Sequence, residues 1–98
     1  MNYSVIWSPQ SKESFENNIL HLLETWSEQD ANDFIDRVEE VLRLISKHPK
    51  IFRYLPEQDA YRCVVVKPVS LFYRLRDNQV ELLTFWDNRM DPKKINIS

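Results

Sequence analysis

The residues of this chain best suited to bind an anion are four arginines in its last third. They are Arg62, Arg74, Arg76 and Arg89. Each lies in or just after one of the short apolar runs between residues 61 and 92, which are typical of β-strands. A charged side chain on a buried strand face is costly unless it is paired. Several arginines on successive strands therefore indicate a sheet face, or its rim, that meets something anionic.

Alternation along residues 69–76 sorts the side chains of this run onto the two faces of a strand. One set is expected to pack beneath helices and comprises Val69, Leu71, Tyr73 and Leu75. The other set is expected to share the open face with Arg62 and comprises Ser70, Phe72, Arg74 and Arg76. Aromatic side chains among arginines, here Phe72 and Phe85, are typical of surfaces that bind polynucleotides. The alternative is that the arginines pair with Glu81, Asp87 and Asp91 and only solubilise the sheet, and the sequence leaves both possibilities open.

The elements that would position these arginines begin with a short strand over residues 2–7 and two helices. Ser8 followed by Pro9 predicts a helix start, because serine caps the first turn and proline lacks the N–H that has no partner there. Apolar residues at helical spacing then continue to Trp26. Ser27 predicts the cap of a second helix, which Pro49 would end. Two antiparallel helices with a very short connection follow from this pattern.

The rest of the chain predicts a connecting loop over residues 50–60 and three strands near 61–67, 69–76 and 79–87. Lys67-Pro68 and Asp77-Asn78 are the expected turns. The chain has no glycine, so a turn that needs positive φ must rely on a residue such as Asp77 or Asn78, and no Gly-rich phosphate loop is available. The order β-α-α-β-β-β predicts a single α+β domain over residues 1–98. It would consist of an N-terminal strand, an antiparallel helical hairpin on one face of the sheet, and a three-stranded antiparallel meander.

Charge is divided unevenly along the 98 residues. Residues 1–42 hold two basic and nine acidic groups, a formal charge of −7, whereas residues 43–98 hold eleven basic and six acidic groups, a formal charge of +5. The positive half can attract an acidic protein or a polynucleotide. The single cysteine cannot form an internal disulfide, and no apolar run approaches the roughly 18–20 residues of a membrane span. The N-terminus lacks the pattern of a signal peptide, so a cytoplasmic protein without a membrane partner is expected.

Metal binding and acid–base catalysis find little support in the sequence. His21 and His48 lie on separate expected helices, and no Cys/His cluster has the spacing of metal ligands. Cys63 is expected to be a small buried side chain. The acidic residues between 28 and 40 are spaced as a solvated helix face. We therefore expect no metal site and no cofactor.

Several segments together resemble the RelE/ParE toxin superfamily, the toxin halves of type II toxin–antitoxin modules. These segments are residues 6–9 (Ile-Trp-Ser-Pro), the hairpin that ends at His48-Pro49, and residues 61–66, 71–75 and 85–92. The likeness covers nearly the whole chain in order and spacing. It implies the same β-α-α-β-β-β fold.

RelE-like members cut mRNA in the ribosomal A site with basic residues on the sheet and a late tyrosine or histidine. There the basic groups stabilise the charge that develops at the phosphate. By resemblance, Arg62 takes a basic position on the first of the three strands, and Arg89 takes that of the arginine after the last strand. Val64 and Ser70 fall where such nucleases have basic residues, and Ile95 falls where the late tyrosine would be. The chain thus keeps only part of the nuclease set.

ParE-like members share the fold, lack the nuclease set and inhibit DNA gyrase, and this chain is more similar to them in its strand motifs and long helical hairpin. The resemblance implies a toxin that acts by binding and is neutralised by a cognate antitoxin. The candidate contact residues for the target or the antitoxin are Arg62, Arg74, Arg76, Trp86, Asn88 and Arg89. Two alternatives are a ribosome-dependent mRNA endoribonuclease with Arg62 and Arg89 as catalytic residues, and a degenerate member that only binds its antitoxin.

Overall fold

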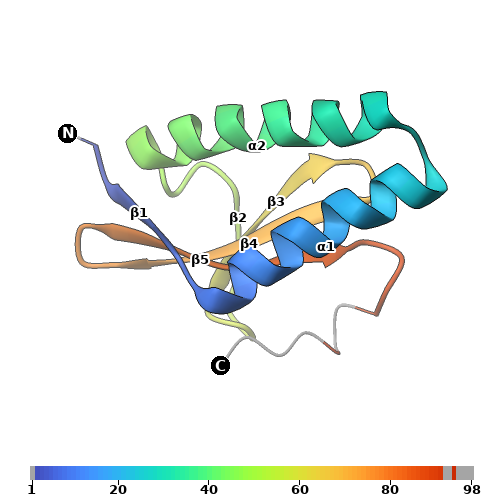
Figure 1. Cartoon of the computed structure of the whole chain (residues 1–98). Helices are drawn as coiled ribbons and strands as arrows, with labels where there is room; N and C mark the ends of the chain where they lie inside the picture. Colours follow the sequence, from blue (N-terminus) through green and yellow to red (C-terminus); the bar gives the residue numbers. More distant parts are fainter. Residues whose placement is uncertain (1, 92–93, 95–98) are drawn as a thin grey trace.

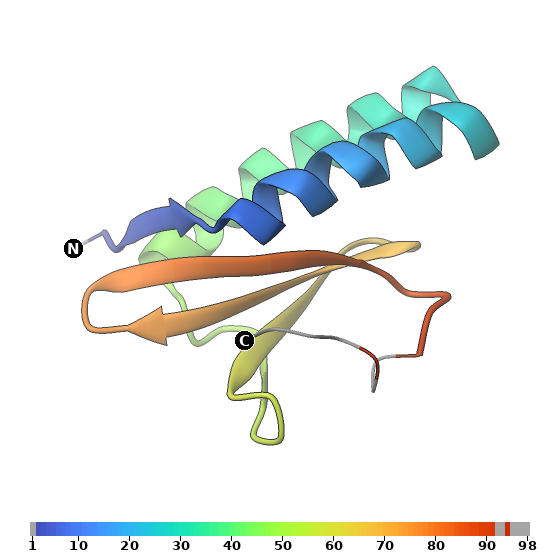
Figure 2. The ribbon, with the colours of Figure 1, turned by 60° about the horizontal axis from the view of Figure 1, so that its bottom comes forward.

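The computed structural model describes residues 2–91 and 94 of the chain. The elements follow in the order β1 (Ser4–Trp7), α1 (Pro9–Thr25), α2 (Glu28–Lys47), β2 (Arg53–Leu55), β3 (Ala60–Val66), β4 (Val69–Arg76) and β5 (Gln79–Asp87). The two helices lie side by side over one face of a five-stranded sheet (Figure 1, Figure 2). The predicted α+β architecture, with its N-terminal strand, helical hairpin and later strands, is confirmed.

Both helices start and stop where their capping residues predict. The Ser8 hydroxyl accepts a hydrogen bond of 3.0 Å from the backbone N–H of Ser11, with Pro9 at the first helical position. The Ser27 hydroxyl accepts a bond of 3.0 Å from the N–H of Asp30. His48 caps the C-terminal end of α2, and Pro49 follows it. These caps satisfy backbone groups that a helix end leaves without a partner.

The sheet has the order β1-β5-β4-β3-β2. Strands β3, β4 and β5 form the predicted antiparallel meander, and β1 pairs with β5 in parallel. Asp77 has φ 53° in the turn between β4 and β5, as the lack of glycine requires, and Asp59 has φ 49° in a turn that the sequence did not indicate. The prediction of a loop throughout residues 50–60 is wrong for β2. That strand has three residues, too few for a periodic pattern, and it depends on pairing with β3.

The main core lies between the sheet and the helices. Phe85 packs there, with its ring centroid 5.6 Å from Trp7, 5.4 Å from Phe15 and 5.9 Å from Phe34. The expectation that Phe85 belongs with the arginines on the other face is therefore wrong. The register between β4 and β5 shifts beside Phe72. An extra residue at such a bulge reverses the alternation of side chains, and this turns Phe85 towards the helices.

The face of the sheet away from the helices is covered in part by a second, smaller cluster. Phe72, Ala60 and Leu83 are its buried members, with Leu55 and Trp86 packed against them. The predicted division of the β4 side chains is confirmed, because Val69, Leu71 and Tyr73 belong to the main core. The face is nevertheless not open at Ser70 and Phe72, which are both fully buried.

Side chains of α1 take the place of a neighbouring strand along part of β5. Strand β1 pairs with β5 only from Gln79 to Leu82. Beyond that point the Ser8 hydroxyl donates to the carbonyl of Leu83 at 3.2 Å. The Ser14 hydroxyl accepts from the N–H of Phe85 at 2.9 Å, and the Asn18 amide donates to the carbonyl of Phe85 at 3.0 Å. Backbone groups of a strand need partners when they are buried, and α1 supplies them.

Candidate functional site

Arg62 lies in a polar cluster that links three strands. Its Nε donates to the Ser70 hydroxyl at 3.2 Å and its Nη2 donates to Oδ1 of Asn88 at 3.2 Å. The Ser70 hydroxyl in turn donates to the same Oδ1 at 2.7 Å. Asn88 also donates through Nδ2 to the carbonyl of Lys67 at 3.0 Å. A buried hydroxyl requires such partners, so Arg62 completes a network that fixes the segment after β5.

Arg74 is directed at the turn between β2 and β3. Its Nε donates to the carbonyl of Asp59 at 2.8 Å and its Nη2 donates to the carbonyl of Gln58 at 3.2 Å. An ion pair of 3.6 Å to the Asp59 carboxylate accompanies these bonds, and the Arg74 side chain is only 12% exposed. Arg76, two residues further along β4, is exposed and forms no ion pair within the described part of the chain.

Arg89 lies just after β5 and contacts a third set of residues, Asp87 and His21. Its guanidinium forms a bidentate pair with Asp87, with Nε–Oδ1 at 3.1 Å and Nη2–Oδ2 at 2.8 Å. The Arg89 hydrogen bond is the main reason why the pKa of Asp87 lies below its usual value. The same guanidinium contacts Nε2 of His21 on α1. His21 was not among the candidate residues, and because it lies 68 positions from Arg89, no local sequence signal could have identified it.

Trp86 lies between the second cluster and the chain that follows β5. Its ring packs against that cluster, and its Nε1 donates to the carbonyl of Met90 at 3.4 Å. A pocket of about 300 Å³ lies between α1 and the end of β5, and its lining includes His21, Trp86 and Asp87. A neighbouring pocket of about 250 Å³ is lined in part by Asn88 and Arg89. The residues near the end of β5 therefore border two small pockets rather than one catalytic cleft.

The arginines that the resemblance places in a nuclease site have different hydrogen-bond partners. Arg62 faces Ser70 and Asn88, whereas Arg89 faces Asp87 and His21, and within residues 2–91 the two share no hydrogen-bond partner. Val64 is 52% exposed and Ser70 is buried. Ile95 lies outside the described residues. Both arginines thus already donate to acceptors within the protein.

The described residues provide neither an activated cysteine nor a metal site. Cys63 is fully buried, and burial raises the pKa of its thiol to about 11, so it remains protonated near neutral pH. Its predicted role as a small buried side chain is confirmed. Among residues 2–91 and 94, no group of three His, Cys, Asp or Glu side chains could hold a metal ion. No helix in that part of the chain is long and apolar enough to cross a bilayer.

Solved structures of toxins from toxin–antitoxin systems have the same fold. A chain from the chromosomal ParDE system of P. aeruginosa superposes with a TM-score of 0.71 at 11% identity, over 87% of this chain and 95% of that one. The YoeB dimer from Staphylococcus aureus gives a TM-score of 0.62 at 14% identity, over 86% and 94% of the two chains. A heterotetrameric YoeB–YefM complex from the same organism gives 0.60 at 14% identity, with the same coverage. At these identities the likeness defines the fold class.

Family membership comes from the sequence match. Residues 5–92 match the family described as the ParE toxin of the type II toxin–antitoxin system, parDE. The chain therefore belongs to the ParE toxin family, within the RelE/ParE superfamily. No curated protein is similar enough in sequence to count as a match.

Proposed function

We propose that this protein is a cytoplasmic toxin that inhibits DNA gyrase by binding to it and that a cognate antitoxin holds it inactive. Membership of the ParE family supports a toxin. The observation that favours binding over RNA cleavage is that Arg62 and Arg89 already donate to different acceptors within the protein. Cleavage by the RelE-like route would need basic groups gathered around the charge that develops on one phosphate. Arginines that already have separate protein acceptors are poorly placed for that task.

Arg89 is the strongest candidate for contact with the target. Its side chain is 59% exposed although it is paired with Asp87. Arginine is enriched among the residues that dominate binding energy at interfaces, and so is tryptophan. Trp86 and Asn88, which are both half-buried, lie beside Arg89 at the end of β5. Arg62 and Arg74 would act on this region indirectly, by fixing the segments around it.

The proposed antitoxin partner is supported by exposed apolar side chains on α1. Leu20, Leu23 and Trp26 are 58%, 46% and 54% exposed, and they lie three residues apart. Side chains at this spacing lie near one another along a helix, and such a stripe is suited to a partner helix or extended segment. The YoeB–YefM structure is that of a toxin–antitoxin complex. The antitoxin of this chain would cover the α1 stripe.

The deciding experiment compares the two possible targets with the same purified protein. We expect the protein to block supercoiling by purified gyrase and to leave mRNA intact on translating ribosomes. Addition of the antitoxin from the neighbouring gene should restore supercoiling. Codon-positioned mRNA cleavage with normal gyrase activity would replace the proposal with a ribonuclease. Absence of both activities, together with normal growth on induction, would identify a degenerate member.

A further inference from the structure

A second basic surface lies away from the strand arginines, at the end of α2 and in the loop that follows. We call it the α2-end surface, and its cations are Arg43, Lys47, Lys50 and Arg53. All four are exposed, and no acidic residue occurs between positions 41 and 56. None of the four forms an ion pair within the described residues, whereas Arg37, Arg74 and Arg89 do. These cations are therefore available to an external anion.

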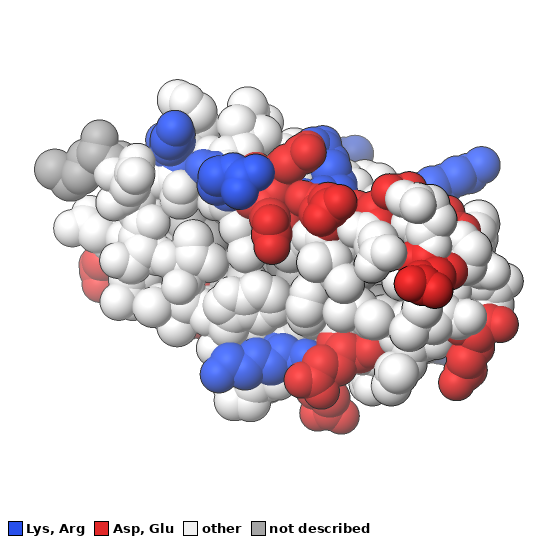
Figure 3. All heavy atoms as spheres, turned by 45° about the horizontal axis from the view of Figure 1, so that its top comes forward, with Lys and Arg blue, Asp and Glu red and all other residues white. Residues whose placement is uncertain are grey.

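The charge of the surrounding helical face makes this surface distinct. Figure 3 shows most acidic side chains over the middle and right of that face, whereas its left part is mainly basic and uncharged, with an acidic side chain at the left edge. That end corresponds to the end of α2 in Figure 1. An anionic partner would be repelled by the first part of α2 and attracted to its end.

A pocket of about 580 Å³ opens within the α2-end surface. Its apolar lining comes from Tyr3, Pro49 and Ile51, and its polar lining from Lys47, His48 and Lys50. Tyr3 is held in place by a bond of 2.7 Å from its backbone N–H to the carbonyl of Ser46. Ile51 is 55% exposed. Among the described residues, no carboxylate lines the pocket.

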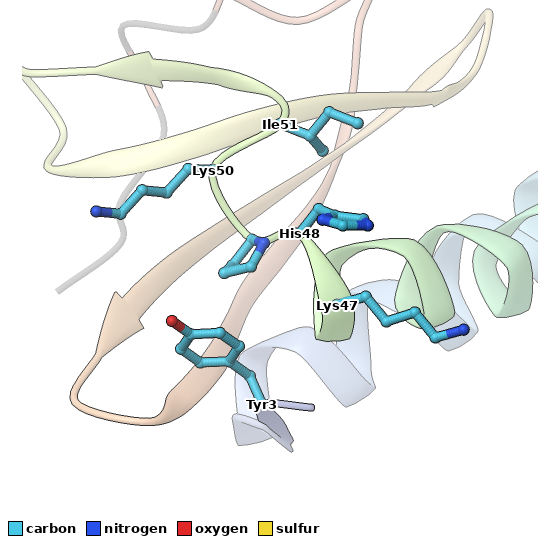
Figure 4. Close-up of a pocket in the computed structure, with 6 residues that line it drawn as sticks. Tyr3, Lys47, His48, Lys50 and Ile51 are labelled. Carbon is cyan, nitrogen blue, oxygen red and sulfur yellow. The ribbon is translucent and has the colours of Figure 1, made fainter. Parts of the chain in front are cut away.

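The directions of the two lysines indicate what kind of anion fits. In Figure 4, Lys47 and Lys50 extend away from each other, and the Tyr3 ring lies between them. In this arrangement the two ammonium groups do not point at one small anion. They can contact two separate negative charges on either side of a group that occupies the pocket. A nucleic-acid strand has this form, with phosphates on either side of a base.

We propose that the α2-end surface binds single-stranded nucleic acid, with one base stacked on Tyr3 and the flanking phosphates contacting Lys47 and Lys50. Arg43, one turn before Lys47 on α2, would extend the line of cations. Aromatic stacking combined with a basic groove is the usual means of binding single strands. Duplex DNA would reach the cations but could not place a base in the pocket. The inference does not depend on gyrase being the target.

Fluorescence anisotropy with labelled 12-nucleotide oligothymidylate and oligouridylate tests this proposal on the full chain. At about 50 mM salt we expect saturable binding to one or both strands. If two or three phosphates are contacted, binding should weaken roughly tenfold between 50 and 200 mM salt. Lack of binding to either strand at 50 mM salt would overturn the proposal.

Two charge-reversal variants locate the site. Lys47→Glu/Lys50→Glu should weaken binding at least tenfold. Lys12→Glu/Lys67→Glu makes the same change in net charge at exposed lysines outside the pocket and should weaken binding by less than about threefold. Equal losses in the two variants would mean that only overall charge matters, and this would overturn the site. Thermal unfolding of each variant checks that the fold is retained.

The base-stacking part of the proposal has its own test. Tyr3→Ala should weaken binding to oligothymidylate about tenfold, because base–aromatic stacking contributes about 1–3 kcal/mol. Tyr3→Phe keeps the ring and should bind as the unchanged protein does. A 12-residue glutamate peptide that displaces the label as well as unlabelled oligothymidylate does would favour an acidic protein segment and overturn the proposal. Equal binding by Tyr3→Ala and Tyr3→Phe would do the same.

Discussion

The strand arginines and the cations at the end of α2 carry the same charge but differ in their surroundings. Arg62 and Arg74 donate to acceptors within the protein, and Arg89 is paired with Asp87. Lys47 and Lys50 are exposed and have no ion pair within the described residues. Cations of the first kind stabilise the fold, and those of the second kind can bind an external anion. A basic residue therefore cannot be assigned to a binding surface until its acceptors are known.

The largest expected difference in stability lies between Arg74, whose side chain is bonded within the protein, and the exposed Arg76. We expect Arg74→Ala to lower the free energy of unfolding by about 2–3 kcal/mol, because two charged hydrogen bonds to backbone carbonyls are lost. Arg76→Ala is the matched control on the same strand and should change the free energy by less than about 0.5 kcal/mol. Urea denaturation measures both. Equal values for the two variants would show that Arg74 is no more structural than Arg76.

Arg89 is paired with Asp87 but remains exposed, so it combines a feature of each of the two groups of cations. Arg89→Ala should reduce gyrase inhibition about thirtyfold, the equivalent of roughly 2 kcal/mol for a central interface arginine. Its free energy of unfolding should change by less than about 0.5 kcal/mol, since exposed ion pairs contribute little. The measurements are the inhibitory concentration in a supercoiling assay and urea denaturation, with Lys94→Ala as the control. Unchanged inhibition, or an unfolded variant, would count against Arg89 as a contact residue.

The cluster around Asn88 tests whether Arg62 acts as part of a network. Arg62→Ala and Asn88→Ala should each lower the free energy of unfolding by about 1–2 kcal/mol. The double variant should fall short of the sum by about 0.5–1 kcal/mol, because both residues share a hydrogen bond. For Asn88→Ala combined with Arg76→Ala, the two changes in the free energy of unfolding should add. If the losses of unfolding free energy caused by Arg62→Ala and Asn88→Ala also add in the double variant, the two side chains act independently.

The smallest expected effect is a pH dependence at Asp87. Its pKa is lowered from the ordinary 3.8, chiefly by the Arg89 hydrogen bond. A carboxyl whose pKa is lower in the folded state stabilises the fold above its unfolded pKa, and this contribution is lost as pH falls below about 4. Arg89→Ala should therefore reduce the acid dependence of the unfolding free energy slightly, and so should Asp87→Asn. Identical profiles for the unchanged protein and Asp87→Asn would contradict the assignment.

Local rules predicted the elements of this fold well. The caps at Ser8 and Ser27 fixed both helix starts, because serine hydroxyls bond to backbone groups only three residues away. Apolar alternation located β3, β4 and β5 to within a residue. Strand β2 could not be predicted in this way, since its three residues depend on a partner strand. The orientation of Phe85 depended on a bulge that alternation does not reveal.

The candidate site was less predictable than the fold. The sequence identified Arg62, Arg74 and Arg89 as cations near a sheet, and their positions follow from the strands. Which acceptors they meet depends on contacts between distant segments, such as Arg89 with His21 or Arg62 with Asn88. The sequence did not indicate a binding surface at the end of α2, because its cations lie in a helix end and a loop rather than in a strand. That they have no ion pair among the described residues depends on the folded structure and cannot be read from the sequence.

The position of β5 inside the sheet, between β1 and β4, has a consequence for synthesis of the protein on the ribosome. Strand β5 pairs with β1 on one side and with β4 on the other, and it is the last of the described strands in chain order. A nascent chain that ends before Gln79 has β1 and α1 but no strand to join them to β4. Ser8, Ser14 and Asn18, whose side chains bond to β5 in the folded protein, are synthesised before their partners on that strand. The chain therefore cannot complete its sheet until β5 has left the exit tunnel.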